Sequence, residues 1–274
     1  MPTLSGWEGC QFMGYSRVMT DSAPLVLRAI ALVVHGSRDP RPRQAAELLA
    51  SRLSVALAAA NARSIVGVTQ LDCATSPLNV QLVEFAQRAR SAGAQRIEIV
   101  PLFLSLGVHS TVDVPEQVAL ATQAMGAAWD DRWQLYPALG VWPGIDRVLA
   151  ASWRRVATGK PNRSWVLMAH GSRNWAGNQL AEHLAERLGM SVAYWAIDPK
   201  LGDRLTELAA AGHRDLGVLP YFLFAGSLTE AIGQQIQAWQ VDRPEVTVQW
   251  LEPIGPSPEL VDLIASQLLD ELNE

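Results

Sequence analysis

One sequence motif, an apolar run followed by His-Gly-Ser, occurs twice in the chain. This repeat constrains the fold more than any other feature. "LVVHGSRDPR" begins at Leu32, and "VLMAHGSRNW" ends at Trp175. The following residues also correspond: "HGSRDPRPRQAAELLASRL" aligns with "HGSRNWAGNQLAEHLAERL", and the matching apolar positions are spaced for one face of an amphipathic helix. Such self-similarity indicates that one structural unit is built twice.

Two further segments repeat in the same order. "AGAQRIEIVPLFLSLG" aligns with "AGHRDLGVLPYFLFAG", and "LGVWPGIDRVLAASW" aligns with "IGPSPELVDLIASQL". Each half is predicted to run strand, helix, strand, helix, strand, long loop and helix, strand, helix. This alternation predicts an α/β protein of two tandem, similar three-layer domains, flavodoxin-like or Rossmann-like, each with a mainly parallel sheet flanked by helices.

The polar segment "ATGKPNRSW" lies between the last helix predicted in the first half and the first strand predicted in the second. A chain of 274 residues is long enough to form two domains, each with its own buried core. We therefore expect a loose extension over residues 1–27, an N-terminal domain over 28–158 and a C-terminal domain over 163–274. Because the tandem repeat supplies both halves, we expect a monomer.

Charge and hydropathy exclude several classes of function. A formal charge of −5 and the lack of a basic stripe argue against a nucleic-acid partner. No apolar run approaches the ~20 residues that span a bilayer, and we expect a soluble cytoplasmic protein with no membrane partner. The two cysteines, Cys10 and Cys73, form neither a metal motif nor a disulfide framework.

Two histidines follow predicted strands of the first half. His35 comes directly after "IALVV", and His109 follows the apolar stretch "IEIVPLFL". Ligands of open α/β sheets bind beyond the carboxyl ends of the strands, so both rings would enter one crevice if the two strands are neighbours. A structural alternative is equally open for His35, in which its ring bonds backbone while Gly36 and Ser37 form a turn and a helix cap.

A carboxylate is the natural third member of such a site. Asp72 follows the apolar stretch "IVGVTQL", at another predicted strand end, where it would equally suit a turn or a helix cap. Asp113 and Glu116 follow His109 closely. Charge at a helix N-terminus, with Pro115 in the first turn, is the alternative for both, and we favour it for Glu116.

The second copy lacks the same set of side chains. Alignment of the two glycine turns places Leu228 opposite His109 and Ile232 opposite Asp113. His170 remains in the second half without a histidine partner. The histidine pair thus occurs once, and we expect the active site to belong to the first half and the second half to carry a degenerate site.

Taken together, these motifs resemble the class II tetrapyrrole chelatases, specifically the long, two-domain sirohydrochlorin chelatases of the cobalamin and siroheme pathways. The resemblance rests on "LVVHGSRDPR", on "VPLFLSLGVHSTVDVPEQV" and on the repeat with "VLMAHGSRN" and "LPYFLFAGSLTEAI". It covers about residues 28–274. It implies chelatase-like domains and a lyase that inserts Co²⁺ or Fe²⁺ into metal-free sirohydrochlorin without ATP, the metal being a substrate and no cofactor being permanently bound.

The resemblance also assigns site residues. The two motif histidines that carry metal binding and catalysis in the family fall on His35 and His109, and an acidic residue, usually Glu, falls on Asp72. Imidazoles suit Co²⁺ and Fe²⁺, and two histidine ligands leave coordination positions open for the macrocycle. A histidine that does not hold metal, or a nearby carboxylate, is suited to accept the pyrrole protons. Sequence alone does not divide these roles.

Two questions stay open at this stage. Arg38, Arg41 and Arg43 are candidates to bind the substrate's carboxylates, or they form a solvated basic turn. The rival to catalysis is a non-catalytic metallochaperone or tetrapyrrole carrier: the presence of both histidines favours the enzyme, whereas the shorter Asp72 favours the carrier. Hydrolysis is disfavoured, because no G-x-S-x-G nucleophile motif occurs.

Overall fold

The computed structural model describes residues 27–157, 163–173 and 176–270. The predicted N-terminal extension, up to residue 26, and most of the predicted linker, residues 158–162, lie outside the described residues. Within them, no helix combines the length and the apolar character that a membrane crossing requires.

Both halves contain the predicted order of elements. The first half consists of β1 (Arg28–Val34), α1 (Pro40–Ala59), β2 (Ser64–Gln70), α2 (Leu78–Ser91), β3 (Arg96–Pro101), η1 (His109–Asp113), α3 (Val114–Met125), η2 (Ala127–Arg132), β4 (Trp133–Leu135), η3 (Leu139–Val141) and α4 (Ile145–Ala157). The second half consists of β5 (Ser164–Ala169), α5 (Ala176–Leu188), β6 (Ser191–Tyr194), α6 (Leu201–Ala210), β7 (Asp215–Pro220), α7 (Ser227–Val241), β8 (Thr247–Trp250) and α8 (Pro258–Asp270).

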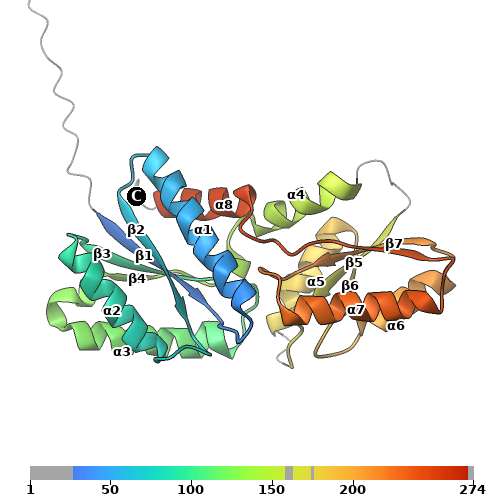
Figure 1. Cartoon of the computed structure of the whole chain (residues 1–274), viewed down its shortest axis with the longest axis horizontal. Coiled ribbons are helices and arrows are strands. Elements are labelled where there is room, and N and C mark those ends of the chain that lie inside the picture. The colour runs from blue at the N-terminus through green and yellow to red at the C-terminus, as the bar shows by residue number, and fades with distance from the viewer. Residues whose placement is uncertain (1–26, 158–162, 174–175, 271–274) are drawn as a thin grey trace, which may run out of the picture.

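Each half holds one four-stranded parallel sheet, and the two sheets have the same topology (Figure 1). The strand orders are β2-β1-β3-β4 and β6-β5-β7-β8. Strands β1 and β5 are therefore central, and all seven residues of β1 are buried, as expected for a strand covered on both faces. The predicted α/β class with two tandem, similar domains is confirmed.

Side chains of β1 alternate between two apolar cores, because successive residues of a strand face opposite sides of the sheet. Ile30 and Leu32 point into a core that includes α1. Ala31 and Val33 point into a separate core formed with α2 and α3. The second half has its own separate core between its sheet and helices α6 and α7.

The core on the α1 side is continuous through both halves, because the last helix of each half packs against the other half. Figure 1 shows α8 beside α1, and the carbonyl oxygen of Leu268 accepts a 2.8 Å hydrogen bond from Arg28 Nη1 in β1. Helix α4 instead joins the second half: Trp153 packs edge-on against Trp165 of β5, with ring centroids 6.3 Å apart. The two halves thus exchange their terminal helices, which fixes one half against the other.

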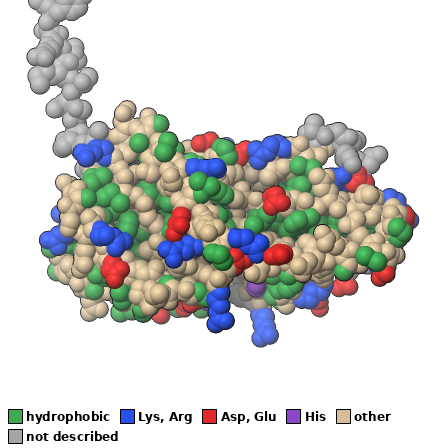
Figure 2. All heavy atoms as spheres, viewed as in Figure 1, with side chains coloured by type: hydrophobic (Ala, Val, Ile, Leu, Met, Phe, Trp, Pro, Cys, Tyr) green, Lys and Arg blue, Asp and Glu red, His purple; other side chains and the backbone are tan. Residues whose placement is uncertain are grey.

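Charged side chains do not segregate over the surface seen in Figure 2. Basic and acidic side chains are interspersed on this face, and histidine atoms show at its lower edge, between the halves. Such an even distribution gives no field of one sign that would attract a polyanion to this face.

Candidate metal centre between the two halves

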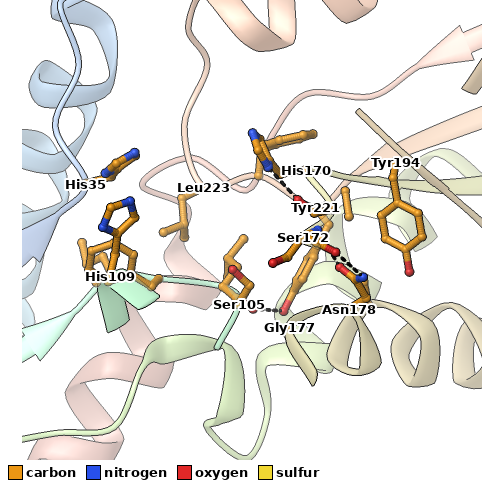
Figure 3. A pocket seen from close by; sticks show the side chains of 17 residues that line it. His35, Ser105, His109, His170, Ser172, Gly177, Asn178, Tyr194, Tyr221 and Leu223 are labelled. Carbon is orange, nitrogen blue, oxygen red and sulfur yellow. Dashed lines mark hydrogen bonds between the residues drawn. The ribbon is translucent and has the colours of Figure 1, made fainter. Parts of the chain in front are cut away.

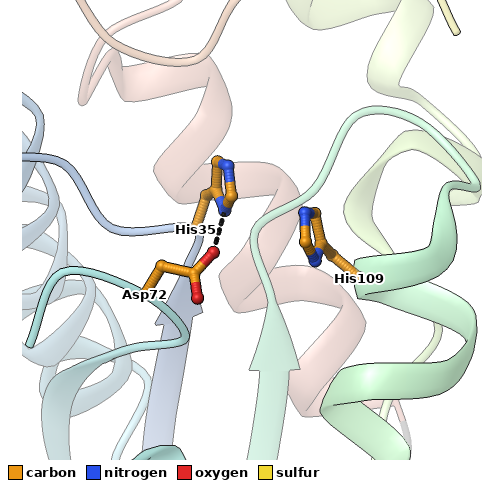
Figure 4. Close-up of side chains that lie close together, drawn as sticks. All are labelled: His35, Asp72 and His109. Atoms are coloured by element: carbon orange, nitrogen blue, oxygen red, sulfur yellow. Dashed lines mark ion pairs between the residues drawn. The ribbon is translucent and has the colours of Figure 1, made fainter.

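The ends of β1 and β2 bring His35 and Asp72 together. Parallel pairing continues past both strands, since the amide of Leu71 donates to the carbonyl of Val34 (2.9 Å) and the amide of Asp72 donates to the carbonyl of His35 (2.7 Å). Oδ2 of Asp72 lies 3.5 Å from Nδ1 of His35, and Figure 4 shows this ion pair. The shorter aspartate side chain therefore reaches the imidazole.

Gly36 makes this close approach of two turns possible. It adopts φ +96°, and a Cβ atom at this position would lie 1.9 Å from the carbonyl oxygen of Asp72. An L-residue here would be strained by its backbone conformation and would push the Asp72 turn away from His35.

Replacement of Gly36 by alanine is therefore expected to separate His35 from Asp72 and to weaken Co²⁺ binding. The loss of affinity should exceed that caused by an alanine placed at a similar backbone conformation away from the site. Gly93 is a matched control, because it has φ +94° and a Cβ atom added there would meet no neighbour within 4 Å. Thermal unfolding and cobalt titration of Gly36→Ala and Gly93→Ala test this. Equal Co²⁺ affinities in the two variants would contradict it.

The histidine of the third strand reaches the same place from a loop. β3 ends at Pro101, which pairs with Val33 of β1, and so it is shorter than the apolar stretch "IEIVPLFL" suggested. His109 begins the short π-helical turn η1, which continues into α3. Its ring centroid lies 4.7 Å from that of His35, as the facing rings in Figure 4 illustrate.

Asp113 holds the His109 ring from the other side. Its Oδ2 lies 2.6 Å from Nδ1 of His109, one helical turn away. A carboxylate accepts only, so Nδ1 carries the proton and Nε2 keeps its lone pair. Asp113, whose alternative role was to place negative charge at a helix N-terminus, therefore fixes the tautomer of His109, a candidate metal ligand. The i,i+4 spacing of His109 and Asp113 was the signal that could have revealed this.

Substitution of Asp113 by alanine is expected to lower Co²⁺ affinity roughly 10–100-fold, the usual cost of losing a group that orients a metal-binding histidine. Glu116 is a matched control, since it is an exposed acid in the first turn of α3. Cobalt titrations of Asp113→Ala and Glu116→Ala provide the measurement. If both variants bind Co²⁺ like the wild type, Asp113 has no such role.

His35, Asp72 and His109 lie close enough together to hold one metal ion. One ligand atom from each residue lies within 4.8 Å of those of the other two. Desolvation by burial and then the nearby His109 lower the pKa of His35, against the opposing effect of Asp72. The ring is thus held in its neutral, metal-binding form near pH 7, and two imidazoles with one carboxylate suit Co²⁺ and Fe²⁺.

The second half presents a different set at the corresponding positions. The amide of Ala196 donates to the carbonyl of His170 (2.8 Å), as Asp72 does to His35, so alanine stands where the carboxylate would be. Leu228, the alignment partner of His109, lies in the first turn of α7. Of His35, Asp72 and His109, only His35 therefore has a matching side chain at the corresponding position of the second half, which is His170.

A cavity of about 340 Å³ connects the two halves at this point. Figure 3 shows His35 and His109 on one side of it and His170, Tyr194 and Tyr221 on the other. An adjoining cavity of about 510 Å³ also reaches both His35 and His170. Most of the exposed lining of the two cavities is apolar with a few polar groups, as expected of a small-molecule site.

Three polar contacts join the halves around this cleft. The hydroxyl of Tyr221 donates to the carbonyl of Leu104 (2.8 Å), and the hydroxyl of Ser227 donates to Oδ2 of Asp39 (2.9 Å). Arg41 pairs with Glu230 across the halves at 2.9 Å. These contacts connect the two walls of the cleft.

The arginines after His35 have different surroundings. Arg41 is engaged by Asp39 and Glu230, and its hydrogen bonds to Asp39 lower the pKa of that carboxyl. Arg43 pairs with Glu47 and also lines the larger cavity. Arg41 thus ties the halves together, and Arg43 is the one of the two that faces the cleft.

Comparison with known proteins places these features in a family context. A family model described as CbiX matches the chain twice, over residues 29–156 and 164–271. A sirohydrochlorin cobaltochelatase of Methanopyrus kandleri is 32% identical over 104 residues, which are 38% of this chain and 63% of the relative. A protein of the same name from Methanocaldococcus jannaschii is 33% identical over 94 residues, 34% of this chain and 60% of the relative. The alignments thus span less than two thirds of either relative.

Solved structures share the architecture along most of the chain. SirB from Bacillus subtilis with Fe³⁺ has a TM-score of 0.71 at 18% identity, covering 89% of this chain and 95% of SirB. A sirohydrochlorin chelatase SirB in complex with cobalt, from Bacillus subtilis subspecies spizizenii, has a TM-score of 0.64 at 21% identity, covering 89% and 95%. At these identities the likeness establishes a common fold.

Proposed function

The chain belongs to the CbiX family, and from this membership we propose that it is a sirohydrochlorin chelatase, which inserts Co²⁺ or Fe²⁺ into a metal-free tetrapyrrole without ATP. The observation that carries the proposal is the meeting of His35, Asp72 and His109 at the mouth of the cleft between the halves. The relatives named sirohydrochlorin cobaltochelatase agree with this activity.

The chemistry follows from what the cluster offers. Two imidazoles and one carboxylate bind a divalent metal while leaving coordination positions for water and then for pyrrole nitrogens. All three residues are exposed, so the metal enters from solvent and leaves toward the macrocycle. A closed cysteine cage would retain the metal, whereas this open set is suited to handing it on.

The apolar cavity supplies the place for the macrocycle. Phe103, Leu104 and Leu223 line it beside the histidines and offer apolar contact to a flat ring system. The ring of Phe103 lies 6.5 Å from that of His35, so an occupant packed on Phe103 is within reach of the metal site. The metal is thereby held beside the ring that receives it.

The test is an anaerobic optical assay with purified protein, sirohydrochlorin and Co²⁺ or Fe²⁺. We expect the absorption spectrum to change to that of the metallated product faster than in protein-free solution. A rate no greater than the protein-free rate would refute the enzyme. Tight binding of metal or tetrapyrrole without acceleration would identify the alternative, a metallochaperone or tetrapyrrole carrier. Parallel assays with Co²⁺, Fe²⁺ and Ni²⁺ identify the preferred metal.

Asp72 provides a prediction on the site's charge. Asp72→Asn removes the negative charge beside His35 but keeps nearly the same size, and we expect Co²⁺ affinity to fall roughly 10-fold or more, as for a lost metal-site partner. Asp72→Glu restores the family's usual residue and should keep most of the affinity. Cobalt titrations of both variants measure this, and equal losses in both would mean that shape, not charge, matters here.

We also propose that one chain is sufficient, because residues of both halves line the cleft. Light scattering of the purified protein is expected to give the mass of one chain. A dimer that retains activity only when associated would contradict this.

A further inference from the structure

His170 of the second half faces the same cleft as the histidine pair. It lines both cavities together with His35, and Figure 3 shows it on the side of the pocket opposite His35 and His109. Its ring is not part of the set whose ligand atoms lie within 4.8 Å of one another. It is therefore near the substrate's place but apart from the metal's.

The tautomer of His170 is set by the backbone. Its Nδ1 lies 2.9 Å from the carbonyl oxygen of Gly171, which only accepts, so Nδ1 carries the proton. The lone pair of the neutral ring is then on Nε2. Among the described residues, no hydrogen bond to this Nε2 is found, and the ring is exposed to the cleft.

The turn that carries His170 is braced in its own way. Asn178 bonds Ser172 twice, accepting from its amide and donating to its carbonyl, each at 2.8 Å. Gly171 has φ +78°, and a Cβ there would lie 2.9 Å from the Cβ of Tyr194. The hydrogen bond from Tyr221 to Leu104 then ties this wall to the loop that leads to His109. These contacts hold the turn that carries His170 on the wall of the pocket opposite His35 and His109.

We propose that His170 is a catalytic residue that accepts the inner pyrrole protons while His35 and His109 hold the metal. The proposal rests on the chelatase function proposed above. Each macrocycle N–H bond breaks with its electron pair left on nitrogen, where that pair forms the bond to the metal. The proton adds to Nε2 of His170, and the imidazolium releases it to water before the second proton leaves. The metal stays divalent, and no oxidant is required.

The position of His170 explains why this residue suits the task. A histidine that binds metal has no lone pair for a proton, and a proton added beside the metal would be repelled by its charge. His170 avoids both conflicts, because it lies outside the metal-binding set.

The test compares metal binding with metal insertion in His170→Ala. We expect Co²⁺ affinity within about 2-fold of the wild type but insertion slower by at least ~100-fold, the lower bound for loss of a positioned base. Added imidazole should restore part of the rate by occupying the vacated space. His170→Gln should be equally slow without restoration, because the amide fills the space and accepts no proton. His183→Ala, an exposed histidine on α5, should insert metal like the wild type.

Three results would overturn the inference while leaving the proposed function intact. These are a wild-type insertion rate in His170→Ala or His170→Gln, a loss of Co²⁺ affinity that parallels the loss of rate, or a slow alanine variant that imidazole does not restore. Failure of the wild-type protein to insert any metal would instead refute the proposed function itself.

Discussion

Replacement of His109 by alanine is expected to lower the rate of cobalt insertion at least ~100-fold, because it removes a ligand that the second half cannot replace. His109 faces His35 at 4.7 Å between ring centroids, and its counterpart by alignment is Leu228. His35→Ala should have a similar effect. The measurement is the initial rate of the anaerobic optical assay at saturating sirohydrochlorin, together with a cobalt titration of each variant.

His35→Ala and His109→Ala should lose metal binding as well as metal insertion. This distinguishes them from His170→Ala, which is expected to lose only insertion. His183→Ala serves as the matched control, since it removes an exposed imidazole outside the cleft. If His109→Ala retains wild-type Co²⁺ affinity and rate, the metal is not held by the cluster.

The second large effect concerns stability. Arg28 and Glu98 form an ion pair that is almost fully buried between β1 and β3, with 3% and 1% of each residue exposed. Glu98→Ala leaves the guanidinium buried without its carboxylate, and we expect the free energy of unfolding to fall by about 3–5 kcal/mol. Arg28 also donates to the carbonyl of Leu268 in α8, and a shift of the Arg28 side chain toward solvent in the variant would weaken this contact of the exchanged C-terminal helix.

Urea denaturation of Glu98→Ala against the wild type measures this cost. Glu207→Ala is the control, because Glu207 pairs with Arg204 on the surface of α6 and such exposed pairs contribute only about 0.2–1 kcal/mol. Double replacement, Arg28→Met with Glu98→Leu, should recover part of the stability, because it removes both buried charges while losing the hydrogen bond from Arg28 to Leu268. Equal decreases in the free energy of unfolding for Glu98→Ala and Glu207→Ala would show that breaking the buried ion pair costs no more than breaking the exposed one.

The repeated fold and the meeting of residues at the strand ends could be predicted from the sequence for a physical reason. Parallel strands place their carboxyl ends at one edge of the sheet, so residues that follow successive strands meet there. His35, Asp72 and His109 are three such residues, and the order β2-β1-β3 makes their strands neighbours. The predicted class and element order needed only local periodicity and the alternation of strands with helices.

The exchange of α4 and α8 could not be predicted in this way. Periodicity shows that a helix has an apolar face but not which sheet covers it, and both helices follow a strand of their own half. Contacts such as Trp153 with Trp165 join residues whose meeting depends on the relative placement of the halves. The same limit applies to His170: the alignment shows that it lacks a histidine partner but not that it lines the same cleft as His35.

Binding of Co²⁺ between His35, Asp72 and His109 underlies every step of the proposed reaction, and anomalous diffraction at the cobalt edge from a cobalt-soaked crystal can locate the metal. We expect one dominant peak within bonding distance of a ring nitrogen of each histidine, and no such peak in His109→Ala. A dominant peak elsewhere in the wild-type protein, or an unchanged peak in the variant, would contradict this assignment of the metal site.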